Sequence, residues 1–171
     1  MGVRLRTRCM TMSASATAEG TTRANLEHAW TVGTPMTPVG YYPKYGPLPA
    51  VIRVRDQTGP WDAPGQTRKL MLSDGGSVVE QVVRVERPHL MVYELGDFQK
   101  VFGRLVSGAR AEWIYTAEGD GARIRWTYTY FAKPGAGILV KAIIRIFWAP
   151  YMKRVLPGIL SEIDRTSSTS S

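Results

Sequence analysis

The chain has 171 residues, of which 44% are hydrophobic and 21% charged, and its formal net charge is +8. This length supports one domain with a sizeable core and argues against a second domain. The single cysteine, Cys9, excludes an internal disulfide framework and a metal site built from several cysteines, which is compatible with a reducing compartment and a cytoplasmic location.

The two ends of the chain differ from the rest in composition. The first nine residues, MGVRLRTRC, are basic but lead into the polar segment SASATAEG, whereas a secretory signal continues into an apolar run of about 7–15 residues. We expect residues 1–9 to be a disordered leader, with Met10 and Met12 as alternative translation starts. Without this leader, which carries three arginines, the formal charge falls from +8 to +5. The polar tail at 166–171 is also expected to be disordered, which leaves a single domain at 10–165.

The first part of that domain predicts a strand followed by a helix. Residues 10–18 alternate loosely and predict a strand rich in small side chains. The next segment carries helix punctuation, with Thr21 or Thr22 as the cap and with Gly33 and Pro35 at the end. A stretch rich in proline and tyrosine follows and allows at most a short second helix.

From residue 50 onward the apolar period changes to two, which is typical of antiparallel strands. A tight hairpin turn is expected at SDGGS, and residues 96–105 carry no clear pattern. The final segment, from about 138 to 163, predicts one long apolar helix that Pro150 and Pro157 interrupt. The expected strands are 50–57, 66–73, 77–86, 90–95, 106–116 and 122–132.

A twisted antiparallel sheet needs its apolar face covered, and the terminal helix is the only predicted element that is long enough. We therefore expect an α+β helix-grip fold. In this fold a strongly curved antiparallel sheet of about seven strands wraps around a long C-terminal helix, with one or two short helices after the first strand.

Four stretches in succession carry a family resemblance: LEHAW with Trp30, PGQTRKLMLSDGGSVVEQVV, RPHLMVYEL and GARIRWTYTYFAKP. Over residues 10–165 this ordered set resembles the SRPBCC superfamily, which includes the START, birch-pollen-allergen-like and polyketide cyclase/dehydrase-like proteins. The resemblance implies a deep cavity between the sheet and the terminal helix that holds an apolar small molecule. We match none of the catalytic residues proposed for the aromatase/cyclases of this superfamily to this chain.

The last predicted strand alternates aromatic and basic or polar side chains. Trp126, Tyr128 and Tyr130 share one face, and Arg123 and Arg125 share the other. The aromatic face is a core face, a cavity wall or partly both. The two tyrosine hydroxyls favour the cavity wall, because a buried hydroxyl without a partner costs about 1–3 kcal/mol, whereas a hydroxyl in a pocket orients a ligand. A nucleic-acid platform needs aromatic and basic groups on one face, so no nucleic-acid partner is expected.

Other aromatic side chains are candidates for the same cavity wall. Tyr93 shares a strand face with Met91, and Trp113 shares one with Tyr115. Trp61 lies in a predicted turn, where it is either a lid at the cavity mouth or docked on the surface of the protein. The predicted ligand-binding set is Trp61, Tyr93, Trp113, Tyr115, Trp126, Tyr128, Tyr130, Ile143 and Phe147.

No complete catalytic set is recognisable, although three residues are catalytic candidates. Glu80 interrupts the apolar run SVVEQVV. It is either a buried general acid or base, or a carboxylate that faces solvent or pairs with an arginine such as Arg68. Tyr128 and Tyr130 are the other two candidates. The two histidines do not make a usual three-ligand zinc site without carboxylate help, and neither a metal nor a cofactor is expected.

The terminal apolar segment contains Lys141 and Arg145, and its uninterrupted part is shorter than the roughly 20 apolar residues of a membrane span. The two cations share one face and leave an unusually wide apolar sector. That sector can cover a cavity, form a homodimer surface or make transient contact with a membrane surface.

The predicted function is binding or transport of a hydrophobic small molecule, such as a lipid, a sterol-like compound or a polyketide-like compound. The alternative is a polyketide cyclase/dehydrase-like enzyme that acts on a ligand in the same cavity.

Overall fold

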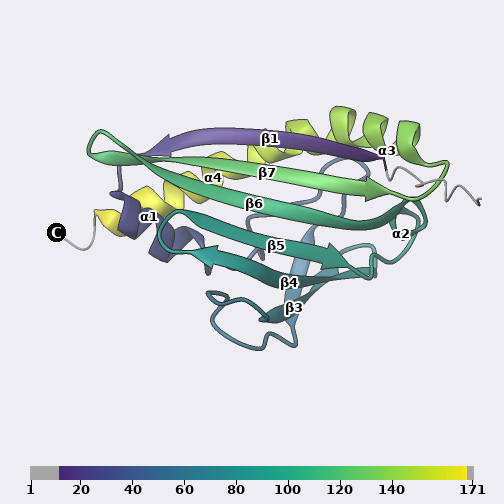
Figure 1. Ribbon diagram of the computed structural model, residues 1–171, viewed down its shortest axis with the longest axis horizontal. Coiled ribbons are helices and arrows are strands. Elements are labelled where there is room, and N and C mark those ends of the chain that lie inside the picture. Colours follow the sequence, from purple (N-terminus) through teal and green to yellow (C-terminus); the bar gives the residue numbers. More distant parts are fainter. Residues whose placement is uncertain (1–11, 169–171) are drawn as a thin grey trace, which may run out of the picture.

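Seven antiparallel strands form one sheet in the computed structural model, which describes residues 12–168 (Figure 1). Their order across the sheet is β1-β7-β6-β5-β4-β3-β2. The predicted leader at 1–9 lies outside the described residues. The strands are β1 (Ser13–Thr22), β2 (Val51–Arg55), β3 (Thr67–Leu72), β4 (Ser77–Glu86), β5 (Leu90–Gly96), β6 (Val106–Glu118) and β7 (Gly121–Ala132).

The expected alternation of the last strand is confirmed in β7. Trp126, Tyr128 and Tyr130 are buried on the inner face, whereas Arg123 and Arg125 are exposed on the outer face. Aromatic and basic side chains of β7 therefore lie on opposite sides of this strand.

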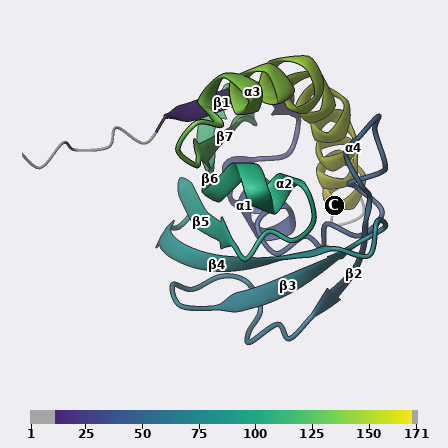
Figure 2. The same cartoon turned by 90° about the vertical axis from the view of Figure 1, so that its right-hand side faces the viewer.

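The helices lie on the concave face and at the ends of the sheet (Figure 2). They are α1 (Leu26–Gly33), α2 (Phe102–Leu105), α3 (Gly137–Ile143), the π-helical turn η1 (Ile144–Trp148) and α4 (Ala149–Ser167). The predicted helix-grip architecture is confirmed, since the sheet curves around the long C-terminal helical segment. Among residues 12–168, no helix is both long enough and apolar enough to cross a membrane.

Two expectations about the N-terminal part are corrected. The first strand runs from residue 13 to residue 22, so Thr22 ends β1 instead of capping a helix. The cap of α1 is Asn25, whose side chain accepts a hydrogen bond from the backbone N–H of His28 at 2.9 Å. The Thr22 hydroxyl instead donates to Asp164 at 2.5 Å and ties β1 to the end of α4.

The predicted interruption of the terminal helix at Pro150 is wrong, and the structure shows why. Proline has no N–H and its ring collides with the carbonyl one turn back. The preceding turn, η1, widens to a π-helix, in which the N–H of Ala149 bonds the carbonyl of Ile144, and α4 begins at Ala149 with Pro150 in its first turn. The predicted interruption at Pro157 is also wrong, because Pro157 lies inside α4, which continues past it. The helix also continues through Ser167, which is two residues into the predicted tail; residues 169–171 lie outside the described part.

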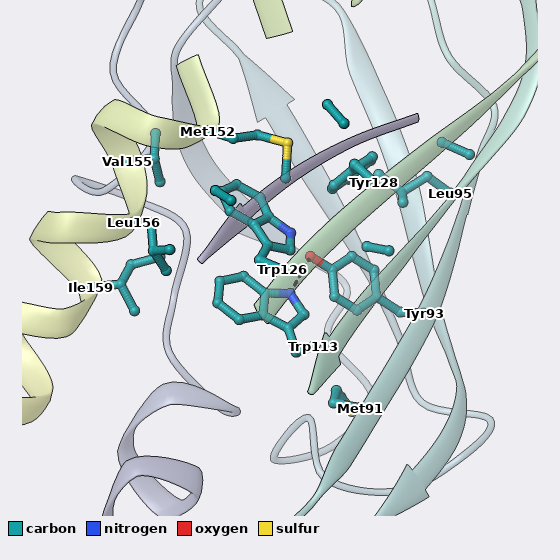
Figure 3. Packing of buried hydrophobic residues seen from close by; sticks show 14 of the residues in the cluster. Met91, Tyr93, Leu95, Trp113, Trp126, Tyr128, Met152, Val155, Leu156 and Ile159 are labelled. Carbon is teal, nitrogen blue, oxygen red and sulfur yellow. Dashed lines mark hydrogen bonds between the residues drawn. The ribbon is translucent and has the colours of Figure 1, made fainter. Parts of the chain in front are cut away.

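The core lies between α4 and the inner faces of β1, β7 and β6. Met152, Val155, Leu156 and Ile159 of α4 point toward the aromatic side chains of the sheet (Figure 3). This packing occupies the half of the sheet nearest β1. It leaves the half formed by β3, β4 and β5 without direct cover from α4.

Candidate functional site

A cavity of about 610 Å³ lies between the β3–β5 half of the sheet and the stretch formed by η1 and the first turn of α4. Aliphatic side chains of the sheet, including Leu70, Val78 and Leu95, form its floor. Ile144 and Trp148 of η1 cover it from the opposite side. The predicted cavity between sheet and terminal helix is therefore present, at the place where α4 leaves the sheet uncovered.

The mouth of the cavity is marked by the exposed members of its lining. Asp74 belongs to the β3–β4 turn, Lys100 and Val101 belong to the loop before α2, and Pro47 belongs to the segment before β2. Phe147, which is half-buried, lies beside this last segment, since a Cβ on Gly46 would be 3.6 Å from its ring. The mouth thus opens at the end of the molecule that carries α2 and α3 (Figure 1).

Three tyrosine hydroxyls face the cavity without a protein partner. Tyr42, Tyr128 and Tyr130 all line it, and their hydroxyls make no hydrogen bond to another residue within 12–168. The Tyr128 and Tyr130 rings stack at 5.2 Å between centroids, and both contact the Trp148 ring edge-on. The indole N–H of Trp148 is buried and likewise has no partner among the described residues.

Burial controls the protonation of these phenols. Burial raises the pKa of Tyr128 and Tyr130 well above the ordinary value of 10.0, and the neighbouring Tyr93 and Glu80 add to the rise. The pKa of Tyr42 is raised by the same causes. All three hydroxyls therefore keep their protons at neutral pH and can donate hydrogen bonds to a ligand.

Arg68 and Glu80 form a buried ion pair in the cavity wall. The Nε of Arg68 donates to Oε2 of Glu80 at 2.6 Å, and the two side chains are only 6% and 3% exposed. They face each other on β3 and β4, where Arg68 is registered opposite Glu80. The alternative in which Glu80 pairs with Arg68 is therefore observed, whereas a solvent-facing Glu80 is excluded.

Trp61 packs against the Arg68 side chain of this pair. Its ring lies 3.9 Å from the Cζ of Arg68 and contacts Tyr93 edge-on at 5.9 Å. Because Trp61 is 1% exposed, it is docked on the protein instead of standing at the mouth as a lid.

A second, much smaller cavity of about 30 Å³ lies behind the first. Trp61, Trp113 and Tyr115 line it, and Tyr93 lines both cavities. The Tyr93 hydroxyl accepts a hydrogen bond from the Trp113 indole at 3.3 Å (Figure 3). This volume holds about one water molecule, so these aromatics support the wall of the large cavity more than they extend it.

The predicted ligand-binding residues are thus divided by the structure. Tyr93, Tyr128, Tyr130, Ile143 and Phe147 line the large cavity, as does the catalytic candidate Glu80. Trp61, Trp113 and Tyr115 line the small one. Trp126 lines neither, because it is fully buried and stacked on Trp113 at 4.8 Å.

Sequence reasoning missed several residues that line the cavity from irregular segments. Tyr42 comes from the stretch rich in proline and tyrosine, and Phe98 comes from the loop before α2. Neither lies in a periodic pattern that shows where its side chain points. Trp148, four residues after Ile144, shares its buried helical row and was identifiable from that spacing.

Within the described residues, no group of three or more histidine, cysteine, aspartate or glutamate side chains is placed to hold a metal ion. The buried polar groups of the large cavity are phenols, one indole N–H, the Ser77 hydroxyl and the Arg68–Glu80 pair, while Asp74, Gln99 and Lys100 lie at its rim. Such a set binds and orients an organic molecule through hydrogen bonds.

The sequence profile of one protein family, described as polyketide cyclase / dehydrase and lipid transport, matches residues 13–160. The chain belongs to this family. The match extends from β1 into α4 and includes every strand that lines the cavity. No curated protein matches the chain.

Solved structures with the same fold agree with this membership. Norcoclaurine synthase from Thalictrum flavum, as a point mutant with a transition-state analogue, superimposes with a TM-score of 0.66 at 16% identity over 91% of this chain and 97% of that one. Ara h 8.0201 gives 0.56 at 14% identity over 92% and 99%. A protein from Thermus thermophilus gives 0.63 at 14% identity over 90% and 99%. At these identities the likeness shows the fold, while the family match supports binding of hydrophobic ligands in general terms.

Proposed function

We propose that this family member binds an amphipathic small molecule, mostly apolar with one polar end, inside the cavity of about 610 Å³. Ligand sites in proteins commonly measure about 300–1,000 Å³ and combine apolar walls with a few convergent polar groups. The walls from Leu70, Val78 and Leu95 suit an apolar body such as a lipid, a sterol-like compound or a polyketide-like compound.

The observation that carries the proposal is the set of unpartnered donors on this apolar wall. A buried polar group without a hydrogen bond costs about 1–3 kcal/mol. The indole N–H of Trp148 is such a group, while the hydroxyls of Tyr128 and Tyr130 open onto the cavity without a protein partner among the described residues. A ligand carbonyl, hydroxyl or carboxylate at this position would accept from the two hydroxyls and from the indole, and would remove the cost of the buried N–H.

A structural neighbour supports a ligand of this kind. Norcoclaurine synthase has been solved in complex with dopamine and hydroxybenzaldehyde, which are small aromatic molecules with polar substituents. The stacked tyrosines of this chain offer a comparable aromatic surface, with ring faces for an apolar body and hydroxyls for its polar end.

The proposal is tested by titrating the protein with an apolar fluorescent probe, such as a polyene fatty acid. Leu95→Trp places a large side chain in the cavity floor and should weaken probe binding at least tenfold. Ile114→Trp introduces the same side chain on the outer face, where Ile114 is 37% exposed, and should leave binding unchanged. Equal affinities of the two variants, with both folded, would contradict the proposal.

Acid–base catalysis of the cyclase/dehydrase kind is a second candidate function, which the position of Glu80 favours. Its carboxylate lines the same cavity as the Tyr128 and Tyr130 hydroxyls. Because the phenols hold their protons, they would act as donors to a developing oxyanion, while Glu80 would accept a proton if Arg68 released it.

The catalytic candidate is tested with Tyr128→Phe, Tyr130→Phe and Glu80→Gln. Turnover of a reactive polyketide-type substrate should fall at least a hundredfold in one of them, and by a larger factor than the affinity for the probe falls in the same variant. Unchanged turnover in all three would leave binding as the function of the cavity.

A further inference from the structure

The outer face of α3 and η1 exposes large apolar side chains that the core does not use. Ile138 is 82% exposed, Leu139 52% and Ile146 58%. Ile138, Ala142 and Ile146 are spaced four residues apart and form one exposed row along the helix. Three large apolar side chains gathered on this short helical stretch indicate an interaction surface instead of isolated exposure.

The neighbouring row on the same helix leads into the cavity. Leu139, Ile143 and Phe147 are again four residues apart, and Leu139 is exposed whereas Ile143 and Phe147 are half-buried. Ile143 and Phe147 line the cavity. The exposed apolar surface is therefore continuous with the cavity mouth, where Val101, 69% exposed, stands on the rim.

The row on the other side of the exposed apolar stripe is basic. Lys141 and Arg145 are both exposed, and neither forms an ion pair with any residue from 12 to 168. No acidic residue occurs in the sequence between Gly121 and Ser161, which includes all of β7, α3 and η1. The rim of the mouth is mixed, with Asp74 beside Lys100, so the positive charge is concentrated on the helix.

We propose that α3 and η1 dock on an anionic lipid bilayer, so that the cavity mouth faces the membrane and an apolar ligand passes between bilayer and cavity. An amphipathic helix lies in the membrane interface with its apolar residues below the headgroups and its basic residues beside the anionic ones. The exposed row of Ile138 and Ile146, flanked by Lys141 and Arg145, has this arrangement. The inference rests on the proposed ligand binding and adds the source of the ligand.

A second copy of the chain fits this face less well. A two-fold dimer places the same patch on both partners and brings Lys141 and Arg145 near their own copies, where like charges repel. Three exposed apolar side chains also provide less area than the roughly 800 Å² per partner of a standard interface. An anionic bilayer can bury the apolar row below its headgroups and pair the basic row with its anionic headgroups.

The test is co-sedimentation of the full chain with vesicles of phosphatidylcholine, alone or with about one third phosphatidylserine, at low salt and at about 0.5 M NaCl. The chain should bind the anionic vesicles at low salt, bind the neutral ones weakly and lose most of its binding at high salt. Lys141→Gln with Arg145→Gln should lower partition about twenty-five-fold, since each basic residue near an anionic surface contributes about fivefold. Ile138→Ser with Ile146→Ser should lower it about tenfold.

Matched control variants on β2 separate this face from overall charge. Arg53→Gln with Arg55→Gln removes the same charge from exposed positions on the far edge strand, and Ile52→Ser removes a side chain that is 56% exposed. Both controls should leave vesicle binding unchanged within about the factor of five assigned to one basic residue.

A probe-transfer assay distinguishes failure of this inference from failure of ligand binding. The Lys141/Arg145 variant should bind free probe as the unaltered chain does but take it from anionic vesicles at least tenfold more slowly. Vesicle binding that ignores lipid charge, or that falls equally in the β2 controls, would overturn the inference. The inference would also be overturned if the unaltered chain formed a dimer and bound no vesicles at low salt, and if the Ile138/Ile146 variant were monomeric.

Discussion

The buried ion pair between Arg68 and Glu80 gives the sharpest test of the cavity wall. Glu80→Leu leaves the Arg68 guanidinium buried beside the cavity without its carboxylate partner. Arg68→Met leaves Glu80 in the corresponding state, while the unbranched methionine keeps an apolar stem beneath the ring of Trp61. Each single change therefore removes one charge and leaves the other buried without a charged partner.

The expected loss follows from the geometry. At 2.6 Å and an effective dielectric constant of about 20, the attraction between the two charges is about 6 kcal/mol. Desolvation of the two ions offsets most of this, but removing one partner of a buried pair costs about 3–5 kcal/mol because the other remains uncompensated. Water that reaches the pair through the cavity reduces the cost, so we expect about 3 kcal/mol for each single variant. The double variant, Arg68→Met with Glu80→Leu, should lie within about 1 kcal/mol of the unaltered chain.

The assay is urea unfolding at pH 7 followed by far-ultraviolet circular dichroism, which does not depend on the fluorescence of Trp61. Glu19→Gln is the control, because its partners Arg123 and Arg125 are both exposed and such surface pairs contribute about 0–1 kcal/mol. Single losses below about 1 kcal/mol, or a double loss equal to the two single losses together, would refute the reasoning.

Three further predictions concern the remainder of the fold. Above pH 10.0 the free energy of unfolding should fall, because burial raises the pKa of the core tyrosines in the folded protein, whereas the same tyrosines in the unfolded chain ionise near the ordinary value. Five such groups contribute about 7 kcal/mol by one pH unit above that value, so alkaline unfolding should coincide with the rise of tyrosinate absorbance; independent ionisation before unfolding would contradict this. The five are Tyr93, Tyr115, Tyr128, Tyr130 and Tyr151. Asp164 is partly buried, which pushes its pKa up, but hydrogen bonds from the Thr22 hydroxyl and the Arg23 N–H outweigh this and hold the pKa below 3.8. Asp164→Asn should therefore cost about 1 kcal/mol at pH 7 and progressively less as the pH falls below 3.8, whereas a loss independent of pH would show that the carboxylate charge is irrelevant. Gly103 lies in α2, and Gly103→Ala would place its Cβ 1.8 Å from the carbonyl oxygen of Phe98 in the preceding loop. The change should lower the free energy of unfolding in urea by about 1–3 kcal/mol, and an unchanged midpoint would show that α2 and this loop move apart freely.

The strands were predictable where apolar and polar residues alternate strongly. The bounds of β4, Ser77–Glu86, agree with the prediction, because alternation is clear and the tight turn at SDGGS fixes its start. The first strand was displaced by several residues because its inward side chains are alanines, which give a weak apolar period. Pro150 was misread as a break, since nothing in the sequence indicates that a π-turn absorbs the missing hydrogen bond.

The cavity was predictable as a consequence of the fold but not in its detailed lining. Alternation shows that Trp126, Tyr128 and Tyr130 all point inward, yet it does not show which part of the interior is filled. Trp113 stacks on Trp126 and closes that region, whereas the region around Tyr128 and Tyr130 stays open. Packing between distant strands decides this difference, and one strand considered alone does not contain it.

The central claim is that an apolar ligand occupies the cavity between the β3–β5 half of the sheet and η1. Methyl NMR of the isoleucine δ1 groups, recorded during titration with a polyene fatty acid, tests it most directly. The methyls of Ile143 and Ile144, which line the cavity, should shift saturably with one equivalent of ligand. Those of Ile114 on the outer face and Ile163 in the filled core should not move. Shifts confined to Ile114, or no saturable shift at Ile143 and Ile144, would contradict the account.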